Sequence, residues 1–288
     1  MCKSGPKIYG MDTAKLFQSR PPSESFRLAY QQQQNAAAAP RRRAQGTPPA
    51  APSRTRFDPN AKLFRVTLDP KTGKHIPREI SPRDIEKKNA HIWINGIANN
   101  PVRAAELGGY HTGRKEFYMI HNPTGGMLGD LGESALQKLG LRTKVANSTR
   151  DLLRHFDLPS ANVTAHSQGT MILNSALGDL SKEGKDMRGM NLNYHGAAAN
   201  NLLSAGLARR VGAHIQNFQG HALDPVHNIV GMNTLNPLRI AGSVLAAPLL
   251  FNSDPDKSSH TKPDGQAKKL GPVFQSRLFD PLMPRRYP

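Results

Sequence analysis

A serine lies at the point where a strand-forming run gives way to a helix-forming run. Val163 and Thr164 favour a strand, and residues 171–177 favour a helix. Only small or polar residues separate the two runs, and Ser167 is one of them. A sharp turn from strand to helix exposes the hydroxyl at its corner and aims the free N–H groups of the helix at the space beside it. The pattern predicts a nucleophilic serine with hydrogen-bond donors in place for the oxyanion that forms on attack.

The residues around this serine resemble a known motif. Ala165-His166-Ser167-Gln168-Gly169 resembles the nucleophile elbow of the α/β-hydrolase superfamily, in the branch of lipases and esterases. The family more often has glycine at the position of Ala165, but Ala165 and Gly169 still supply the small side chains that this close approach of strand and helix needs. The resemblance implies that the N–H of Gln168 stabilises the oxyanion. It also implies that His166 supports the elbow and points away from the serine.

A serine nucleophile needs a histidine that accepts its proton and a carboxylate that orients the histidine. In families that this chain resembles, the acid follows the second strand after the elbow. Asp224 comes just after such a predicted strand, and Asp224-Pro225-Val226 resembles the family's acid loop. Asp254 and Asp256 are competitors in a more polar loop, and an ordinary turn aspartate is the alternative interpretation of Asp224.

The resemblance places the catalytic histidine in a late loop, where His260 lies. His227 is too near Asp224 along the chain to reach the elbow while that carboxylate holds it. The remaining candidates lie in or near the predicted strands before Asp224: His195, His214 and His221. We therefore expect Ser167, Asp224 and His260 to form a catalytic triad.

A second oxyanion donor is expected after the strand predicted at 90–95. In the hydrolase families, the loop after this strand donates a backbone N–H to the oxyanion. Gly96 permits the close approach of the backbone to the substrate, and Ile97 carries the expected N–H. The alternative is a plain glycine between a strand and a loop.

Alternating strands and helices predict an α/β fold, a mostly parallel sheet with helices on both faces, as the hydrolase resemblance also implies. Turn-forming residues at 69–74 predict a hairpin between strands 63–68 and 75–80. Further strands are predicted at 90–95, 117–121, 163–164, 190–195 and 212–218, and helices at 130–156, with a break near Gly140, and at 202–211. The uncharged segment 240–251 predicts either a lid or interfacial patch over the site, or a buried core helix.

The excess positive charge lies mainly in the N-terminal part of the chain. Residues 1–88 hold 18 basic and 7 acidic residues of the chain's 39 and 21. Low-complexity runs predict a disordered basic arm over 1–60, a hydrolase domain over 61–268 and a loose tail over 269–288. Arg41, Arg42 and Arg43 are candidates for contact with an anionic surface. A solvated linker and a secretion or delivery segment are the alternatives.

The only cysteine is Cys2, so no disulfide forms within the chain. No predicted signal peptide or membrane-spanning segment is present, which predicts a protein made in the cytoplasm and exported, if at all, by a route independent of a signal peptide. No residues have metal-ligand or nucleotide-loop spacing, and the triad chemistry needs no cofactor.

These patterns predict a serine hydrolase that cleaves an acyl ester or lipid, as a lipase, phospholipase or esterase does. The basic arm fits a bacterial effector or toxin. The alternative is a hydrolase-like scaffold whose basic arms bind nucleic acid, an anionic membrane or a protein assembly. Acyl transfer by the same triad is a third hypothesis.

Overall fold

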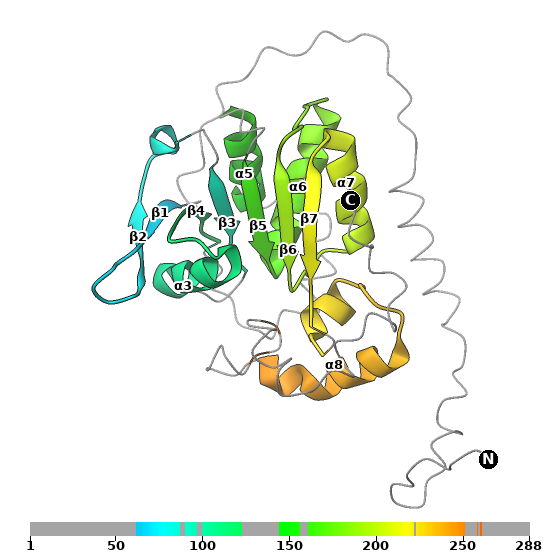
Figure 1. Ribbon diagram of the computed structural model, residues 1–288. Helices are drawn as coiled ribbons and strands as arrows, with labels where there is room; N and C mark the ends of the chain where they lie inside the picture. The colour runs from blue at the N-terminus through cyan, green and yellow to red at the C-terminus, as the bar shows by residue number, and fades with distance from the viewer. Residues whose placement is uncertain are drawn as a thin grey trace, which may run out of the picture. The chain divides into compact units, whose positions relative to one another are not determined.

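A mixed sheet of seven strands lies at the centre of the computed structural model (Figure 1). The structure describes residues 62–86, 90–96, 100–122, 144–155, 161–221 and 223–250, together with Ser258 and His260. The predicted arm over 1–60 and the predicted tail over 269–288 lie outside these residues.

The strands follow one another in the spatial order β2-β1-β4-β3-β5-β6-β7. β1 pairs antiparallel with both β2 and β4, and all other neighbours are parallel. The strands are β1 (Leu63–Leu68), β2 (His75–Glu79), β3 (His91–Ile94), β4 (Glu116–Ile120), β5 (Asn162–His166), β6 (Asn191–His195) and β7 (His214–Gln219). The predicted strands and the predicted mostly parallel sheet are confirmed.

Helices cover both faces of this sheet, as predicted. Alternate side chains of a strand point to opposite faces. Ile92 and Ile94 accordingly join the core beneath α5 (Lys144–His155), α6 (Gln168–Lys182) and α7 (Asn201–Val211). Trp93, between them, joins a second core with Leu107 of α3 (Pro101–Thr112). Burial of each such side chain contributes about 1.5–3 kcal/mol, so the two cores hold the strand ends in fixed positions.

The predicted hairpin is formed by β1 and β2. Asp69 stabilises its turn, because its carboxylate accepts hydrogen bonds from the N–H of Lys71 at 2.9 Å and the hydroxyl of Thr72 at 2.7 Å. Gly73 has a φ of 67°, which only glycine adopts at little cost.

Helix α3 was not predicted, although the sequence contains its end signals. The side chain of Asn100 caps the first turn by accepting from the N–H of Arg103 at 2.9 Å. Pro101 is the first helical residue, and Gly113 ends the helix in the left-handed conformation. The predicted helix at 130–156 is described only as α5, because 123–143 lie outside the described residues.

The uncharged segment forms most of helix α8 (Pro237–Leu250). Its small residues Ser243 and Ala246 are buried, whereas Leu238, Val244 and Leu245 are 54%, 57% and 82% exposed. A core helix has the opposite arrangement, so the described side chains of α8 favour the lid or interfacial patch over the buried core helix. α8 packs against the short π-helix η3 (Val226–Val230) at the end of the sheet to which the arrowheads of β5, β6 and β7 point (Figure 1).

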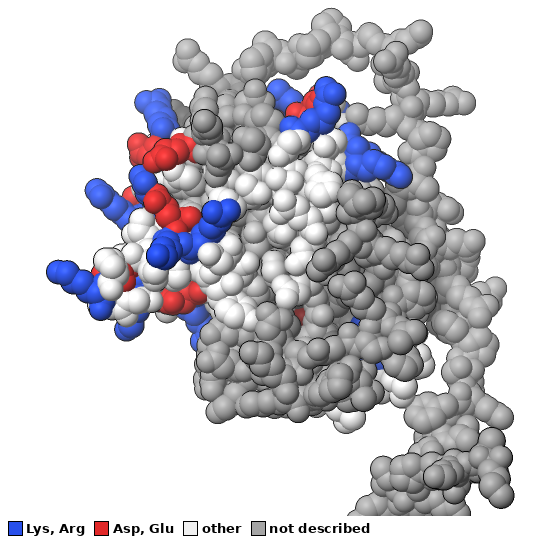
Figure 2. Space-filling model, viewed as in Figure 1, with Lys and Arg blue, Asp and Glu red and all other residues white. Residues whose placement is uncertain are grey.

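The charged side chains visible in Figure 2 gather mainly over the β1–β2 hairpin, where both signs are mixed. Lys62 pairs with Glu79 at 3.1 Å, and Arg65 pairs with Glu86 at 3.3 Å and also with Glu116. In the part of the chain that the structure describes, no helix is both long and apolar enough to cross a membrane.

Candidate active site

The direction of the connections between strands reverses between β3 and β5. The chain continues from β3 to its neighbour β4 and then returns to β5 on the other side of β3. α3 leaves β3 towards one face and α6 leaves β5 towards the other, so the two connections diverge. Parallel α/β sheets bind ligands at the carboxyl ends of their strands at such a point. Gly96 follows β3 here and Ser167 follows β5.

Gly96 and Ser167 lie close together at this point. A Cβ atom added at Gly96 would lie 2.7 Å from the Cβ and 3.1 Å from the Oγ of Ser167. Two hydrogen bonds of the Asn95 side chain, which is fully buried, hold Gly96 in place. The side-chain amide of Asn95 donates to the carbonyl of Gly96 at 2.7 Å, and its oxygen accepts from the N–H of Asn122 at 2.8 Å. Glycine is therefore required by close packing against Ser167, whereas its predicted close approach to the substrate stays a prediction and Ile97 lies outside the described residues.

Ser167 has a strained backbone conformation, with φ 55° and ψ −130°. It occupies the N-cap position of α6, yet its hydroxyl does not cap the helix. An N-cap serine ordinarily uses its oxygen in this way. The conformation costs about 1–3 kcal/mol and is held by the surrounding hydrogen bonds. The N–H of Ser167 donates to the carbonyl of His195 at 3.1 Å, and its carbonyl accepts from the hydroxyl of Thr170 at 2.6 Å.

The turn from β5 to α6 requires small residues on both sides of Ser167. Ala165 is fully buried between Ile94 on β3 and Tyr194 on β6. A Cβ atom at Gly169 would collide with the carbonyl oxygen of Ile94 and lie 2.9 Å from that of Asn95. These surroundings explain why small side chains were expected at Ala165 and Gly169.

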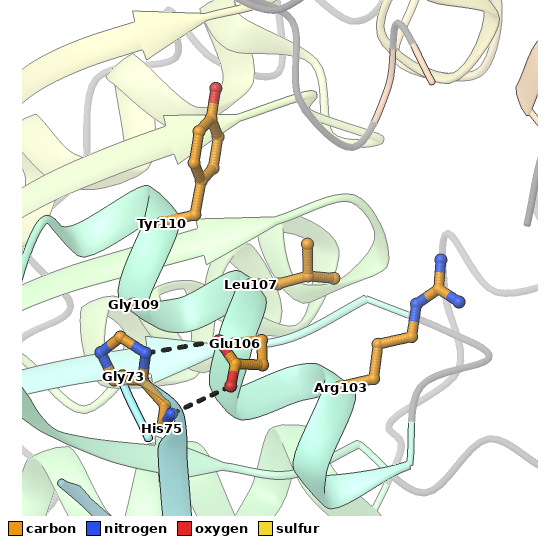
Figure 3. Close-up of a pocket in the computed structure, with 7 residues that line it drawn as sticks. All are labelled: Gly73, His75, Arg103, Glu106, Leu107, Gly109 and Tyr110. Carbon is orange, nitrogen blue, oxygen red and sulfur yellow. Dashed lines mark hydrogen bonds and ion pairs between the residues drawn. The ribbon is translucent and has the colours of Figure 1, made fainter. Parts of the chain in front are cut away.

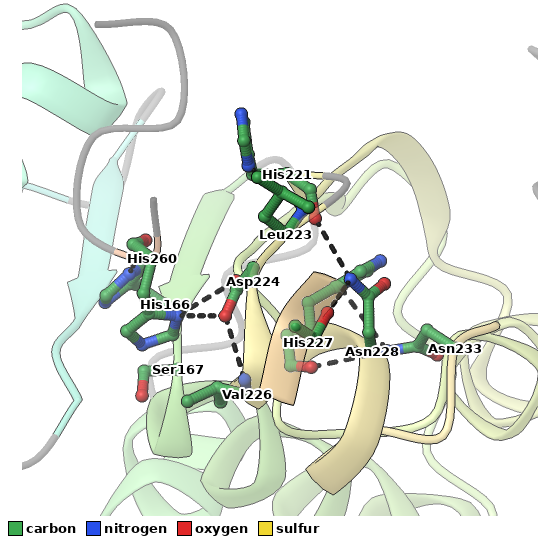
Figure 4. A network of polar contacts seen from close by, with 12 residues as sticks. His166, Ser167, His221, Leu223, Asp224, Val226, His227, Asn228, Asn233 and His260 are labelled. Carbon is green, nitrogen blue, oxygen red and sulfur yellow. Dashed lines mark hydrogen bonds and ion pairs between the residues drawn. The ribbon is translucent and has the colours of Figure 1, made fainter. Parts of the chain in front are cut away.

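Asp224 and His260 form a buried hydrogen-bonded pair beside Ser167 (Figure 4). The Nδ1 of His260 lies 3.1 Å and 3.0 Å from the two carboxylate oxygens of Asp224. A carboxylate only accepts, so Nδ1 carries the hydrogen and Nε2 of a neutral His260 is left as the basic nitrogen. Burial alone raises the pKa of Asp224, but the charge of His260 when it is protonated and its hydrogen bond outweigh this effect and hold the pKa below its usual value.

The loop of Asp224 is fixed by its own backbone. Oδ1 of Asp224 accepts from the N–H of Val226 at 2.9 Å, and the carbonyl of Asp224 accepts from the N–H of Asn228 in η3 at 2.9 Å. π-Helical turns are frequent at functional sites. Gly196, at the end of β6, lies against both members of the pair. Neither η3 nor the role of Gly196 was predicted.

The other candidate histidines have different surroundings. His227 is buried against Gly220, and burial lowers its pKa to about 4 even though Asp224 is nearby. His214 is the first residue of β7 and therefore lies at the other end of the parallel strands from Ser167, and His221 accepts from the N–H of Leu223 at 3.1 Å. His195 ends β6 and is paired in register with His166. Asp254 and Asp256 lie outside the described residues.

Gln168 is the first residue of α6, where backbone N–H groups have no partner within the helix. Its side-chain oxygen accepts from the amide of Asn122 at 2.7 Å, which connects the elbow to the end of β4. Asn95 and Asn122 were not singled out from the sequence. The sequence did contain an indication of both residues, because Asn95 follows the last residue of β3 and Asn122 lies two residues after the end of β4.

His166 lies closer to the site than we expected. Its ring packs against that of His260 with the centroids 4.5 Å apart, and its Nε2 lies 3.0 Å from the carbonyl oxygen of His260. The expectation that His166 only supports the elbow is therefore incomplete. Burial and the neighbouring His260 lower the pKa of His166 to about 3, so this imidazole is neutral in the working range of most proteins.

A separate cavity of about 330 Å³ lies between α3 and the start of β2 (Figure 3). Its lining includes His75 and Glu106, which are joined by an ion pair of 3.6 Å, and the side chains of Arg103 and Tyr110. None of Ser167, Asp224 and His260 lines this cavity, so it is not part of the candidate triad.

The structure thus joins Asp224 and His260 by hydrogen bonds and places Ser167, which follows β5, near this pair at the same end of the sheet (Figure 4). Comparison with models of protein families, with curated proteins and with solved structures finds no match for this chain.

Proposed function

We propose that this protein is a serine hydrolase with an α/β-hydrolase-like fold that cleaves acyl esters through Ser167, His260 and Asp224. The observation that carries the proposal is the combination of a strained Ser167 at a strand-to-helix corner with the buried Asp224–His260 pair at the same end of the sheet. The chain order of serine, aspartate and histidine is that of α/β-hydrolases.

In this mechanism, Ser167 Oγ attacks the ester carbonyl carbon while Nε2 of His260 takes the hydroxyl proton. The tetrahedral intermediate collapses to an acyl-enzyme as His260 returns the proton to the leaving alcohol. Water then attacks the acyl-enzyme by the same steps in reverse. Asp224 remains ionised and stabilises the imidazolium, which agrees with its lowered pKa.

The oxyanion of the intermediate faces the first turn of α6. The N–H of Gln168 supplies one donor and the chain after Gly96 supplies the second, with Ile97 as the proposed residue. Loss of one such donor typically costs about 3 kcal/mol of transition-state stabilisation. The side-chain hydrogen bonds of Asn95 and Asn122 hold Gly96 and Gln168 in fixed positions before substrate binds.

An apolar acyl group is the substrate class that the surroundings favour. α8 exposes Leu238, Val244 and Leu245 and packs against η3, which directly follows the acid loop. Exposed apolar patches of this kind mark surfaces that contact lipid, apolar ligands or proteins. We propose that α8 is a lid or interfacial surface for an acyl ester or lipid.

A fluorophosphonate probe tests the proposed function directly, because it reacts with a serine only when a base activates it. We expect labelling of the native protein and its loss in Ser167→Ala and His260→Ala. Ser175→Ala, two turns along α6, is the matched control and should label fully. A folded native protein that does not label would refute the hydrolase and would favour a binding scaffold, whose affinity for an anionic partner falls steeply with salt.

A further inference from the structure

We propose that His166 is a positioning residue, which holds the catalytic histidine in register with Asp224 through a hydrogen bond to the backbone of His260. This inference rests on the proposed function. It assigns to the residue before the nucleophile a role that neither the elbow geometry nor the triad chemistry requires.

The hydrogen bond has a defined direction. Nε2 of His166 lies 3.0 Å from the carbonyl oxygen of His260, and a carbonyl can only accept. His166 therefore carries its hydrogen on Nε2. Within the described residues, this is the hydrogen bond that fixes the backbone of His260, while the bond to Asp224 fixes its side chain.

Histidine at this position leaves a polar atom without a partner. His166 is 3% exposed, and its Nδ1 makes no hydrogen bond in the structure. A buried acceptor without a donor lowers stability, and an aromatic ring without nitrogen would avoid that loss. The Nε2–H is thus the one feature of the imidazole that a phenyl ring of similar shape cannot supply.

Two further rings pack near that of His166. His111 of α3 stacks on His166 with the centroids 4.8 Å apart, and Trp93 of β3 lies at 6.1 Å. His166 therefore contacts both α3 and His260, and it connects the sheet to a base that lies in a loop. Small displacements of a catalytic group cost about 100-fold in rate, so such a brace affects the chemical step.

Two substitutions separate the hydrogen bond from the ring. His166→Phe keeps a ring without the donor, whereas His166→Gln places an amide donor about where Nε2 lies. For a soluble short-chain ester, we expect His166→Phe to lower kcat by about 10- to 100-fold with KM within about twofold. His166→Gln should recover most of kcat. The control pair His91→Phe and His91→Gln, at the opposite end of β3, should leave both constants unchanged.

A second measurement does not depend on activity. Histidine ¹⁵N NMR reports which ring nitrogen carries hydrogen. We expect the Nδ1–H of His260 to be protected from exchange in the native protein and in His166→Gln, and to exchange faster in His166→Phe. The proposal would be overturned if His166→Phe kept the native kcat and the native protection of the Nδ1–H. It would also be overturned if folded His166→Phe and His166→Gln lost kcat to the same extent. An inactive native protein would refute the hydrolase alone, because the NMR result still tests the brace.

Discussion

Gly196 lies in van der Waals contact with the imidazole of His260. A Cβ atom at Gly196 would be 2.9 Å from Nδ1 of His260 and 3.2 Å from Oδ2 of Asp224. Gly196 also has a φ of 48°, so both its space and its backbone conformation favour glycine. A side chain at position 196 would therefore collide with the hydrogen-bonded pair of Asp224 and His260.

Gly196→Ala should separate His260 from Asp224. We expect labelling by a fluorophosphonate to slow by at least about 100-fold, because the base loses its orientation. Gly184→Ala is a matched control, since Gly184 has a φ of 71° but no atom within 4 Å of an added Cβ. Both variants carry similar backbone strain, and only the first enters the site. Equal labelling of the two would contradict this assignment.

Gly169→Ala should destabilise the protein, because the added methyl group collides with the backbone of Ile94 rather than with a movable side chain. We expect a loss of about 2–4 kcal/mol in the free energy of unfolding, measured by urea denaturation. Gly178→Ala on the same helix meets only Leu207, at 3.9 Å, and should stabilise by about 0.5–1 kcal/mol. A neutral Gly169→Ala would mean that the turn is looser than the structure shows.

The sequence was most informative where a local pattern determines structure. The strands before Gly96 and Ser167 combine apolar runs with small residues at the turn, so both strands and the elbow were predictable. The pairing of Asp224 with His260 spans 36 residues, and its position came from family resemblance. The contacts of Asn95 with Asn122 depend on which strands are neighbours, and the packing of α3 on His166 depends on the path of the chain across the sheet. Neither has a local signature.

Stability should fall as the pH drops below about 6.5, because two buried histidines resist protonation. The pKa of His227 is lowered to about 4 and that of His166 to about 3, against 6.5 for both in an unfolded chain. The unfolded state therefore binds more protons between these values. Each site lowers the free energy of unfolding by about 1.4 kcal/mol per pH unit between about pH 6.5 and its folded pKa.

Urea denaturation of the native protein and of His227→Leu between pH 4 and 8 measures this effect. The variant lacks one of the two groups, so its stability should depend less steeply on pH below about 6.5. Parallel curves for both proteins would show that His227 is not buried as a neutral imidazole.

Asp224→Asn should inactivate the enzyme while preserving the fold. An amide nitrogen facing Nδ1 of His260 favours the wrong tautomer, and in another serine hydrolase this exchange lowers kcat by about 10,000-fold. We expect labelling to slow by about 1,000- to 10,000-fold with native circular dichroism. Asp186→Asn, in an exposed pair with Arg188 at the surface, should label at the native rate. An active Asp224→Asn would remove Asp224 from the triad.

The exposed apolar stripe on α8, formed by Leu238, Val244 and Leu245, should affect the hydrolysis of long-chain substrates more than that of short-chain ones. Leu245 is 82% exposed, so Leu245→Gln removes apolar surface without opening a cavity and should leave the melting temperature unchanged. Loss of one leucine contact with an acyl chain or lipid surface is worth about 1.5–3 kcal/mol at full burial, so hydrolysis of an emulsified long-chain ester should fall about 10-fold or more. Hydrolysis of a soluble short-chain ester should not change.

Ile76→Gln is the control for this effect, because Ile76 is 49% exposed on the distant edge strand β2. It should hydrolyse both substrates at the native rate. If Leu245→Gln slows both substrates equally, α8 acts on the triad itself. If it slows neither, the stripe does not contact the acyl group, and a protein partner becomes the occupant that its apolar surface favours.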